Sequence, residues 1–262
     1  MMSNEAYVFV DGAYLRKAAD ALMQSLYDKP AELNYLAIRH ATSGASRVFY
    51  YDCLNDQQID GESKDAFETR VAAQQALFDS IQHLQGFHVR LGSLSGKRRR
   101  LRQKKVDVLL AVEALDHAFR KNMDRVCLIT GDLDFAPLVD SLIRLGVYVE
   151  IRYEARSASR ELYSTADVAW PITVDDIYNW STTEFRGQHP MPNRTAGQGV
   201  PPSPVLRKGT INGKHVQLHS RPGFSIAYLP EWNGNSLNIE CSDFKLMERY
   251  IEIVYGKLEW NA

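Results

Sequence analysis

Four aspartates in this chain stand where carboxylates could take part in metal-assisted chemistry. Asp11 directly follows the apolar run AYVFV, Asp132 and Asp134 follow the apolar run VCLIT, and Asp107 opens the amphipathic stretch DVLLAVEALDHAF. Carboxylates held close together resist joint ionisation, and a bound divalent cation removes that cost. Carboxylate oxygens are the ligands that Mg²⁺ prefers, and two such ions can assist an in-line displacement at phosphorus. We therefore expect these four residues to bind Mg²⁺ or Mn²⁺ and to be catalytic.

Helix capping is the alternative explanation for the same aspartates. Asp is favoured at the N-cap of a helix, where it contributes about 1 kcal/mol. Asp134 precedes the residues FAP and Asp107 precedes VLLA, so each could begin a helix. Capping does not explain why Asp132 and Asp134 stand two residues apart after an apolar strand. It also leaves Asp11, at another strand end, without a role, so a joint metal site is favoured.

A run of basic residues immediately precedes Asp107. Seven of the nine residues from 97 to 105 are basic and none is acidic: Lys97, Arg98, Arg99, Arg100, Arg102, Lys104 and Lys105. An isolated run of this kind is usually a solvated loop. Beside an acidic metal site, however, it would attract the phosphates of a nucleic acid backbone. We expect these seven residues to bind a nucleic acid backbone without reading its sequence, and the family resemblance described below implies that this nucleic acid is RNA.

The first 180 residues alternate short apolar runs with amphipathic stretches, which predicts an α/β domain with a mostly parallel sheet. We expect strands at 6–10, 47–51, 87–91, 126–129 and 147–151. We expect helices at 15–26, 62–85, 107–119 and 138–145. In open parallel sheets, ligands bind beyond the carboxyl ends of the strands, near the point where strand order reverses. Asp11, Asp132 and Asp134 follow strands in this way.

The composition changes after the α/β region. Residues 185–204 contain five prolines, three glycines and no acidic residue, which predicts a linker between a domain at 1–184 and a small module at 205–262. The module has three short strand patterns and one amphipathic helix pattern, so we expect it to be β-rich with α+β character. It shows no catalytic constellation, and docking to a protein partner, homo-oligomer formation or substrate positioning are its expected roles.

Overall composition excludes several classes of protein. The 31 basic and 32 acidic residues of the 262 nearly cancel, so only local clusters can argue for nucleic acid. Three scattered cysteines fit neither a disulfide framework nor a thiolate zinc site. No stretch is apolar enough for a membrane span and no signal peptide is evident, so we expect no membrane partner and a cytoplasmic location. Zinc-hydrolase, nucleophile-elbow, P-loop and dinucleotide motifs are missing from the sequence.

Four segments resemble the NYN domain family, and specifically its LabA-like branch within the PIN-like nucleases: VFVDGAYL, KKVDVLLAVEAL, ITGDLDFAPLVDSLIRLGVYVEI and SRELYSTADVAW. The resemblance covers residues 5–172. It implies a three-layer α/β/α sandwich with a parallel sheet, and divalent-metal-dependent hydrolysis of RNA phosphodiester bonds. It assigns the acidic positions to Asp11, Asp107, Asp132 and Asp134. It further implies supporting positions at Thr130, within the TGDxDF motif, and at Lys104, Ser159 and Asp167.

One departure from the family pattern motivates an alternative function. Many members have Asn three residues after the first Asp, and here that position is Tyr14. The Tyr14 hydroxyl can still donate a hydrogen bond. The missing Asn nevertheless motivates an alternative hypothesis, in which the protein is an RNA-binding module with weak or no catalytic activity. A third hypothesis, a phosphatase of the haloacid-dehalogenase type, requires a second Asp two residues after the first. Ala13 occupies that position, so we disfavour it.

Overall fold

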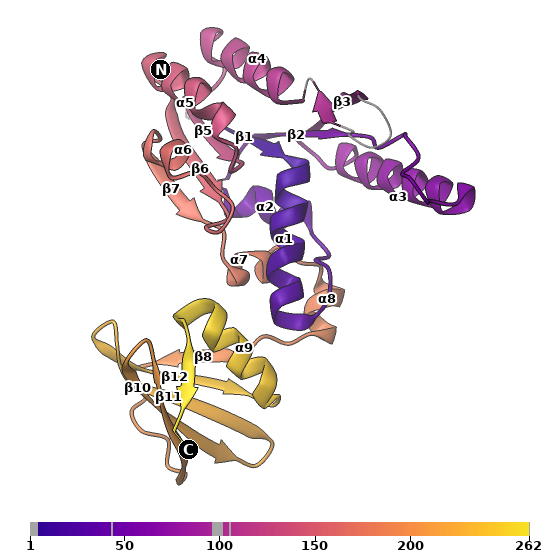
Figure 1. The fold of residues 1–262 in the computed structure, drawn as a ribbon. Coiled ribbons are helices and arrows are strands. Elements are labelled where there is room, and N and C mark those ends of the chain that lie inside the picture. Colours follow the sequence, from indigo (N-terminus) through magenta and orange to yellow (C-terminus); the bar gives the residue numbers. More distant parts are fainter. Residues whose placement is uncertain (1–4, 43, 96–101, 105, 262) are drawn as a thin grey trace. The chain divides into compact units, whose positions relative to one another are not determined.

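The computed structural model describes residues 5–42, 44–95, 102–104 and 106–261. The chain divides into two compact units. The N-terminal unit contains residues 1–18 and 34–172, and the C-terminal unit contains residues 19–33 and 173–262 (Figure 1). The long helix α1 (Gly12–Tyr27) therefore contributes its first half to one unit and its second half to the other.

The N-terminal unit is built on a seven-stranded sheet with the order β4-β3-β2-β1-β5-β6-β7. Its strands are β1 (Ala6–Asp11), β2 (Arg47–Cys53), β3 (Phe87–Ser95), β4 (Arg102–Lys104), β5 (Arg125–Ile129), β6 (Tyr148–Tyr153) and β7 (Val168–Pro171). Among the described strands of this sheet, six run parallel and β4 is antiparallel to its neighbour β3. The predicted parallel sheet is confirmed. Strand order reverses at β1, because β2 lies on one side of it and β5 on the other.

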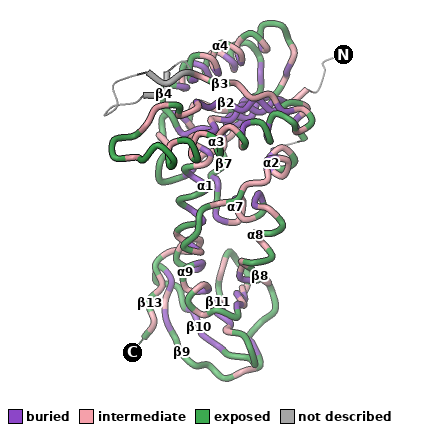
Figure 2. Tube along the Cα trace, turned by 90° about the vertical axis from the view of Figure 1, so that its right-hand side faces the viewer, coloured by how far each residue is buried: buried purple, intermediate pink, exposed green. Residues whose placement is uncertain are grey.

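Helices cover both faces of this sheet (Figure 1). With α1 they are α2 (Tyr35–Ala41), α3 (Lys64–Gln82), α4 (Val106–Phe119), the short 3₁₀ helix η1 (Leu133–Phe135), α5 (Ala136–Arg144) and α6 (Arg160–Ser164). Side chains alternate along each strand, so each face has its own core. On one face, Phe9 of β1 lies in a core with residues of α4 and α5. On the other face, Tyr50 of the neighbouring strand β2 contacts Phe78 of α3. The predicted α/β/α sandwich is therefore confirmed, with burial concentrated in its sheet (Figure 2).

The C-terminal unit contains a separate antiparallel sheet with the order β13-β9-β10-β11-β12-β8. Its strands are β8 (Asn193–Ala196), β9 (Val205–Ile211), β10 (Lys214–Arg221), β11 (Phe224–Trp232), β12 (Asn235–Cys241) and β13 (Leu258–Trp260). Its helices are α7 (Val174–Asn179), α8 (Thr183–Gln188) and α9 (Phe244–Tyr255). The expected β-rich module with one long helix is present, and the sheet is larger than the three predicted strand patterns.

The boundaries of this unit differ from the predicted ones. Segment 185–204 was predicted to be a linker, yet it contains the end of α8 and the edge strand β8, in which Thr195 pairs with Asn238 of β12. The unit also contains residues 19–33 and 173–204 in addition to the predicted 205–262. The sequence pattern did not indicate strand β8, because its residues NRTA are polar and do not alternate with hydrophobic side chains. They can still form an edge strand, since an edge strand pairs through its backbone on one side only.

Across the described ranges, every helix falls short of the length or the hydropathy that crossing a lipid bilayer would need.

Candidate functional site

The carboxyl ends of β1 and β5 form the point where strand order reverses, and the predicted acidic residues gather there. Val10 pairs with Ile129 in the parallel register, so the residues that follow the two strands emerge side by side. Asp11 closes β1, and Asp132 lies three residues beyond the end of β5. The ligand position expected for an open parallel sheet is therefore occupied by carboxylates.

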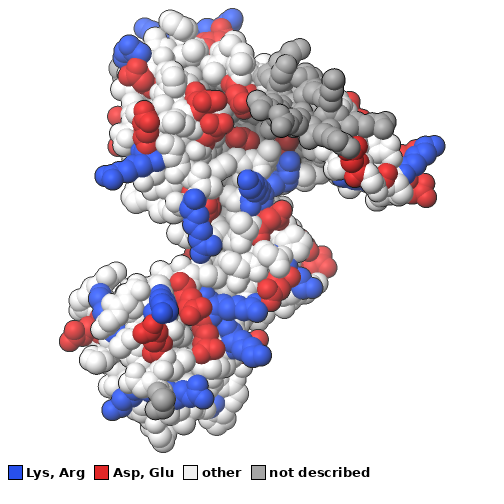
Figure 3. Space-filling view, in the orientation of Figure 1, with Lys and Arg blue, Asp and Glu red and all other residues white. Residues whose placement is uncertain are grey.

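Three of the four predicted aspartates lie near enough to one another to interact electrostatically. Burial raises the pKa of Asp11 to about 6, the hydrogen bond from the Tyr14 amide opposes the shift, and the charges of Asp107, Asp52 and Asp132 add to it. The pKa of Asp107 is also raised, first by burial and then by Asp132 and Asp134. Acidic atoms gather on the face where these elements meet (Figure 3). The structure thus brings Asp11, Asp107 and Asp132 into one electrostatic cluster, with Asp134 at its margin.

Capping accounts for only part of this arrangement. Asp132 is the N-cap of η1, and its Oδ1 accepts a hydrogen bond of 3.0 Å from the amide of Asp134. Asp134 lies inside η1, and Asp107 lies in the first turn of α4, which begins at Val106. Neither Asp107 nor Asp134 is therefore the N-cap that the alternative explanation required. Thr130, a predicted supporting residue, is buried, and its Oγ1 accepts a hydrogen bond of 3.2 Å from the amide of Asp132.

Tyr14 connects three strand ends around the cluster. Its backbone amide donates to Asp11 Oδ1 at 3.0 Å, and its hydroxyl accepts a hydrogen bond of 2.7 Å from the amide of Glu154, just after β6. Gly131, just after β5, packs so closely against the ring that a Cβ there would lie 2.6 Å from the hydroxyl. Burial raises the pKa of the Tyr14 phenol, which therefore keeps its proton. Because the hydroxyl accepts from Glu154, this proton remains able to donate.

The close approach of Gly131 and Tyr14 predicts a specific coupling. Gly131→Ala should destabilise the wild-type protein by about 1–2 kcal/mol, because the new methyl group overlaps the Tyr14 ring. The same substitution in a Tyr14→Asn background should cost less than about 0.5 kcal/mol, because the shorter side chain leaves room for it. Urea denaturation of the four proteins of this cycle measures the coupling. Equal costs in both backgrounds would contradict the packing described here.

Asp52 is a further acidic residue at the carboxyl end of the sheet, and the sequence analysis missed it. It lies in β2, next to the strand end that carries Asp11, and only 1% of its surface is exposed. Arg16 of α1 forms an ion pair with Asp52, and Tyr50 donates a hydrogen bond to the same carboxylate at 3.1 Å. Its position after an apolar run, like that of Asp11, was the available signal. Since it forms an ion pair with Arg16, Asp52 is suited to fixing the start of α1 rather than to binding a cation.

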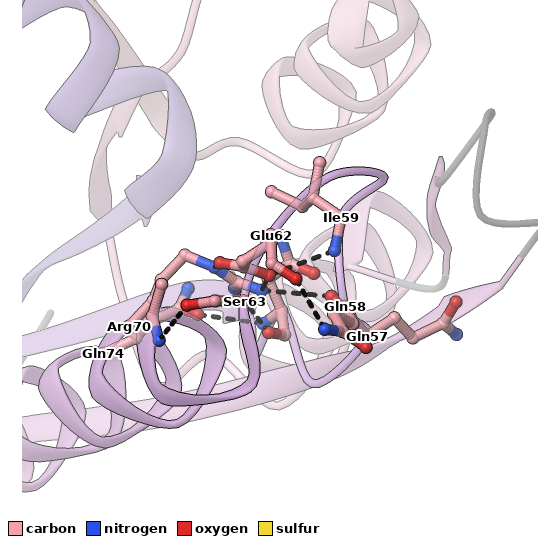
Figure 4. A network of polar contacts seen from close by, with 9 residues as sticks. Gln57, Gln58, Ile59, Glu62, Ser63, Arg70 and Gln74 are labelled. Atoms are coloured by element: carbon pink, nitrogen blue, oxygen red, sulfur yellow. Dashed lines mark hydrogen bonds and ion pairs between the residues drawn. The ribbon is translucent and has the colours of Figure 1, made fainter.

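A polar network fixes the loop that follows β2 (Figure 4). The guanidinium of Arg70 in α3 donates to both carboxylate oxygens of Glu62 and to the backbone carbonyls of Asn55 and Gln57. Gln74, one turn further along α3, donates to the carbonyl of Cys53 at 2.9 Å. The loop is therefore held to α3 at both of its ends, which stabilises the strand end where Asp52 lies.

The remaining predicted residues lie in different parts of the chain. The basic residues Lys97, Arg98, Arg99, Arg100 and Lys105 lie outside the described residues. The backbones of Arg102 and Lys104 belong to β4, so the run connects β3 to the helix that carries Asp107. Ser159 precedes α6, and its amide donates to the Gly131 carbonyl at 3.4 Å, which brings this loop to the β5 end.

Asp167 does not belong to the acidic cluster. Its Oδ2 accepts a hydrogen bond of 2.7 Å from the amide of Val149, near the beginning of β6. The beginnings of parallel strands lie at the opposite edge of the sheet from their carboxyl ends. Asp167 therefore has a structural role in joining β6 to the turn before β7.

The cluster fits a divalent cation by its donor chemistry but is not a closed metal cage. Asp11 and Asp132 each use one carboxylate oxygen for a backbone hydrogen bond and keep the other available. Within the described ranges, no three His, Cys, Asp or Glu residues converge tightly enough to ligate one ion. Mg²⁺ usually takes one or two carboxylates and completes its shell with water and phosphate oxygens. An open set of carboxylates is compatible with that mode of binding.

The raised pKa of Asp11 predicts a pH-dependent stability for the metal-free protein. The folded pKa of about 6 exceeds the ordinary value of 3.8, so Asp11 contributes stability below about pH 4 that is lost as the pH rises through 6. Asp11→Asn should therefore stabilise the metal-free protein by about 1–2 kcal/mol at pH 7.5 and by much less at pH 4. Denaturation in EDTA at both pH values measures this difference. A variant that is less stable than the wild type at pH 7.5 would contradict the electrostatic origin of the shift.

A comparison with models of protein families identifies the family of this chain. The family model described as the NYN domain matches residues 5–173, which include the whole sheet of the N-terminal unit. The chain belongs to the NYN domain family. This is a PIN-like nuclease family, which supports a nuclease or RNA-related role for the NYN domain of this chain. The assignment to the LabA-like branch stays a prediction.

Similar structures add little to this assignment. The chain is similar to a protein of unknown function, VPA0982 from Vibrio parahaemolyticus RIMD 2210633, with 22% identity and a TM-score of 0.48, over 67% of this chain and 96% of that one. It also matches a putative oxidoreductase from Parabacteroides merdae ATCC 43184 with 10% identity and a TM-score of 0.26, over 65% of this chain and 32% of that one. No curated protein matches the chain.

Proposed function

We propose that this protein is a divalent-metal-dependent ribonuclease whose active site is the acidic cluster at the ends of β1 and β5. The observation that carries the proposal is the gathering of Asp11, Asp107 and Asp132 near the point where strand order reverses, where burial raises the pKa of Asp11 and of Asp107 and the charge of Asp132 adds to both shifts. A metal ion is the partner that such a cluster needs. Membership of the NYN domain family supports RNA as the substrate.

The carboxylates would hold Mg²⁺ or Mn²⁺ through their available oxygens. When bound, such an ion lowers the pKa of a water molecule and stabilises negative charge that develops on a phosphate. Asp132 is held for this role by Thr130 and by its cap to Asp134, and Asp11 is held by the Tyr14 amide. The basic run that precedes Asp107 would bind the RNA backbone, because phosphate contacts position a strand without reading its bases. The free thiols of Cys53, Cys127 and Cys241 are in keeping with a reducing, cytoplasmic location.

Cleavage of end-labelled RNA tests the proposal. Wild-type protein should cleave single-stranded RNA in Mg²⁺ or Mn²⁺, should leave a DNA of the same sequence intact, and should lose activity in EDTA. Activity that survives EDTA and extensive dialysis against chelator would contradict a metal-dependent mechanism. Cleavage of DNA at the same rate as RNA would contradict the assignment as a ribonuclease.

The alternative function is an RNA-binding module without catalysis, and the position of Tyr14 is the observation that favours it. Tyr14 fills the space between Gly131 and Glu154, and its hydroxyl is bound to the Glu154 amide. In this alternative the protein binds RNA without metal, and the affinity falls steeply as salt is added. Salt-sensitive binding together with no cleavage in either metal would favour the module over the enzyme.

A further inference from the structure

A groove in the C-terminal unit lies beside the first half of strand β9. Its volume is about 790 Å³, within the range of about 300–1,000 Å³ that is typical of ligand sites. The residues that line it are Val205, Leu206, Arg207, Lys208, Trp260 and Asn261. Two of these residues are cations and none is acidic. The groove is therefore suited to a negatively charged ligand.

The groove lies where the pairing of β9 with β13 ends (Figure 2). β13 pairs with residues 209–211 of β9, and Trp260 is the partner of Gly209. In the described part of the chain, no strand pairs with residues 205–207 on this side of β9. The first residues of β9 therefore form an open edge of the sheet.

A β-bulge makes this edge unsuitable for an added peptide strand. In the pairing with β10, Arg207 and Val205 have successive partners, which leaves Leu206 as an extra residue of β9. A bulge interrupts the regular row of backbone groups that another strand would need, and it redirects side chains. The edge therefore favours a ligand that binds through the side chains of the groove.

The two cations of the groove have no acidic partner. Arg207 and Lys208 are exposed, and neither forms an ion pair with another described residue. By contrast, Arg194, Arg221 and Lys257 of the same unit each form an ion pair with a carboxylate. The positive charges of the groove are therefore available to a ligand.

The carboxylates closest to the groove along β13 and α9 already have partners. Glu259, which precedes Trp260, forms an ion pair of 2.6 Å with Lys257. Glu248 accepts a hydrogen bond of 2.7 Å from the indole nitrogen of Trp260. Residues 185–230 include six Lys or Arg and no Asp or Glu, so the segment that contains β9 adds no negative charge.

The indole ring of Trp260 is held against the sheet. Glu248 fixes its nitrogen, and the ring packs so closely on Gly209 that a Cβ there would lie 2.9 Å from Cε3. Gly209 is the residue that permits this close approach. An aromatic ring beside cations is typical of sites for single-stranded nucleic acids, because every base can stack and every phosphate is an anion.

We propose that this groove binds a short stretch of single-stranded RNA, with a base stacked on Trp260 and neighbouring phosphates bound by Arg207 and Lys208. The choice of RNA as the ligand rests on the proposed function. The groove lies outside the residues that the NYN domain model matches. Among the roles expected for the C-terminal unit, it supports substrate positioning.

Binding of a fluorescein-labelled oligouridine to the full chain tests the groove, with EDTA present to prevent cleavage. The double variant Arg207→Gln, Lys208→Gln should bind at least about fivefold more weakly at physiological salt. The slope of log affinity against log salt should fall by about 1.4, because each phosphate contact to a single strand contributes about 0.7. The matched control is Lys29→Gln, Lys245→Gln, which removes the same charge from exposed positions of the same unit outside the groove. It should bind within about twofold of the wild type.

Trp260→Leu tests the stacking contact separately from the charges. It should weaken binding by about fivefold and leave the salt dependence unchanged, because it removes an aromatic ring and no charge. Circular dichroism confirms that each variant is folded. Groove variants that bind like the lysine control would overturn the proposal. Polyglutamate that displaces the labelled RNA as well as unlabelled RNA does would also overturn it, because the site would then accept any polyanion.

Cleavage measurements separate this inference from the proposed function. If both are correct, the double variant at Arg207 and Lys208 should raise KM and leave kcat within about twofold, because these residues are no part of the acidic cluster. RNA binding that depends on the groove, without cleavage in Mg²⁺ or Mn²⁺, would overturn the proposed function alone. Cleavage by the double variant with the KM of the wild type would overturn the inference alone.

Discussion

Asp132→Asn should reduce metal-dependent RNA cleavage by at least about 100-fold, while the protein remains folded and still binds RNA. Asn keeps an oxygen that can accept the hydrogen bond from the Asp134 amide, and Asn is as good an N-cap as Asp. The substitution therefore removes the negative charge offered to a cation and little else. The loss should appear in kcat more than in KM, because the basic run that would bind the RNA backbone is unchanged.

A surface aspartate provides the matched control for this experiment. Asp140 lies in α5, about two helical turns from Asp132 along the chain, and forms an exposed ion pair with Arg144. Asp140→Asn removes the same charge from the same region and should leave cleavage within about twofold of the wild type, because exposed ion pairs contribute little. Equal activities of the Asp132→Asn and wild-type proteins would remove Asp132 from the active site. Loss of activity in the Asp140→Asn control would mean that cleavage depends on the overall charge of this region and not on the acidic cluster.

The central sheet could be predicted from the sequence because its strands are buried on both faces. The runs that became β1, β2 and β5 are continuously apolar, and such runs are distinctive between amphipathic helices. Asp11 and Asp132 could be placed at one edge because parallel strands end together. The edge strands β4 and β7 were missed, because they are short and pair on one side only.

The parts of the site that escaped prediction depend on contacts between distant residues. Asp52 is separated by 36 residues from Arg16, and they meet because β1, which leads directly into α1, pairs with β2. The hydroxyl of Tyr14 binds an amide 140 residues away. Sequence spacing indicates which residues follow a strand, but it does not show which side chain fills the space between two loops. The contacts by which Tyr14 joins the ends of three strands could therefore be seen only in the structure.

Gly12→Ala should destabilise the N-terminal unit by about 3 kcal/mol or prevent it from folding. A Cβ at this position would lie 2.5 Å from the Tyr50 hydroxyl and 2.6 Å from Asp52 Oδ2. Both partners are fully buried and held by Arg16, so neither side chain can move away without breaking the ion pair. Gly12 is therefore required for steric reasons, because no side chain fits where helix α1 begins directly against β2. This packing lets Asp11 face the cluster.

Gly187→Ala is the control for the steric explanation. Gly187 lies in helix α8, and a Cβ there would have no atom within 4 Å. In a helix this substitution should be neutral or stabilising by up to about 1 kcal/mol. Thermal unfolding of both variants, followed by circular dichroism, should show a large fall in melting temperature for Gly12→Ala alone. A Gly12→Ala protein with wild-type stability would mean that Asp52 and Tyr50 do not press against the start of α1, and the packing that positions Asp11 would have to be revised.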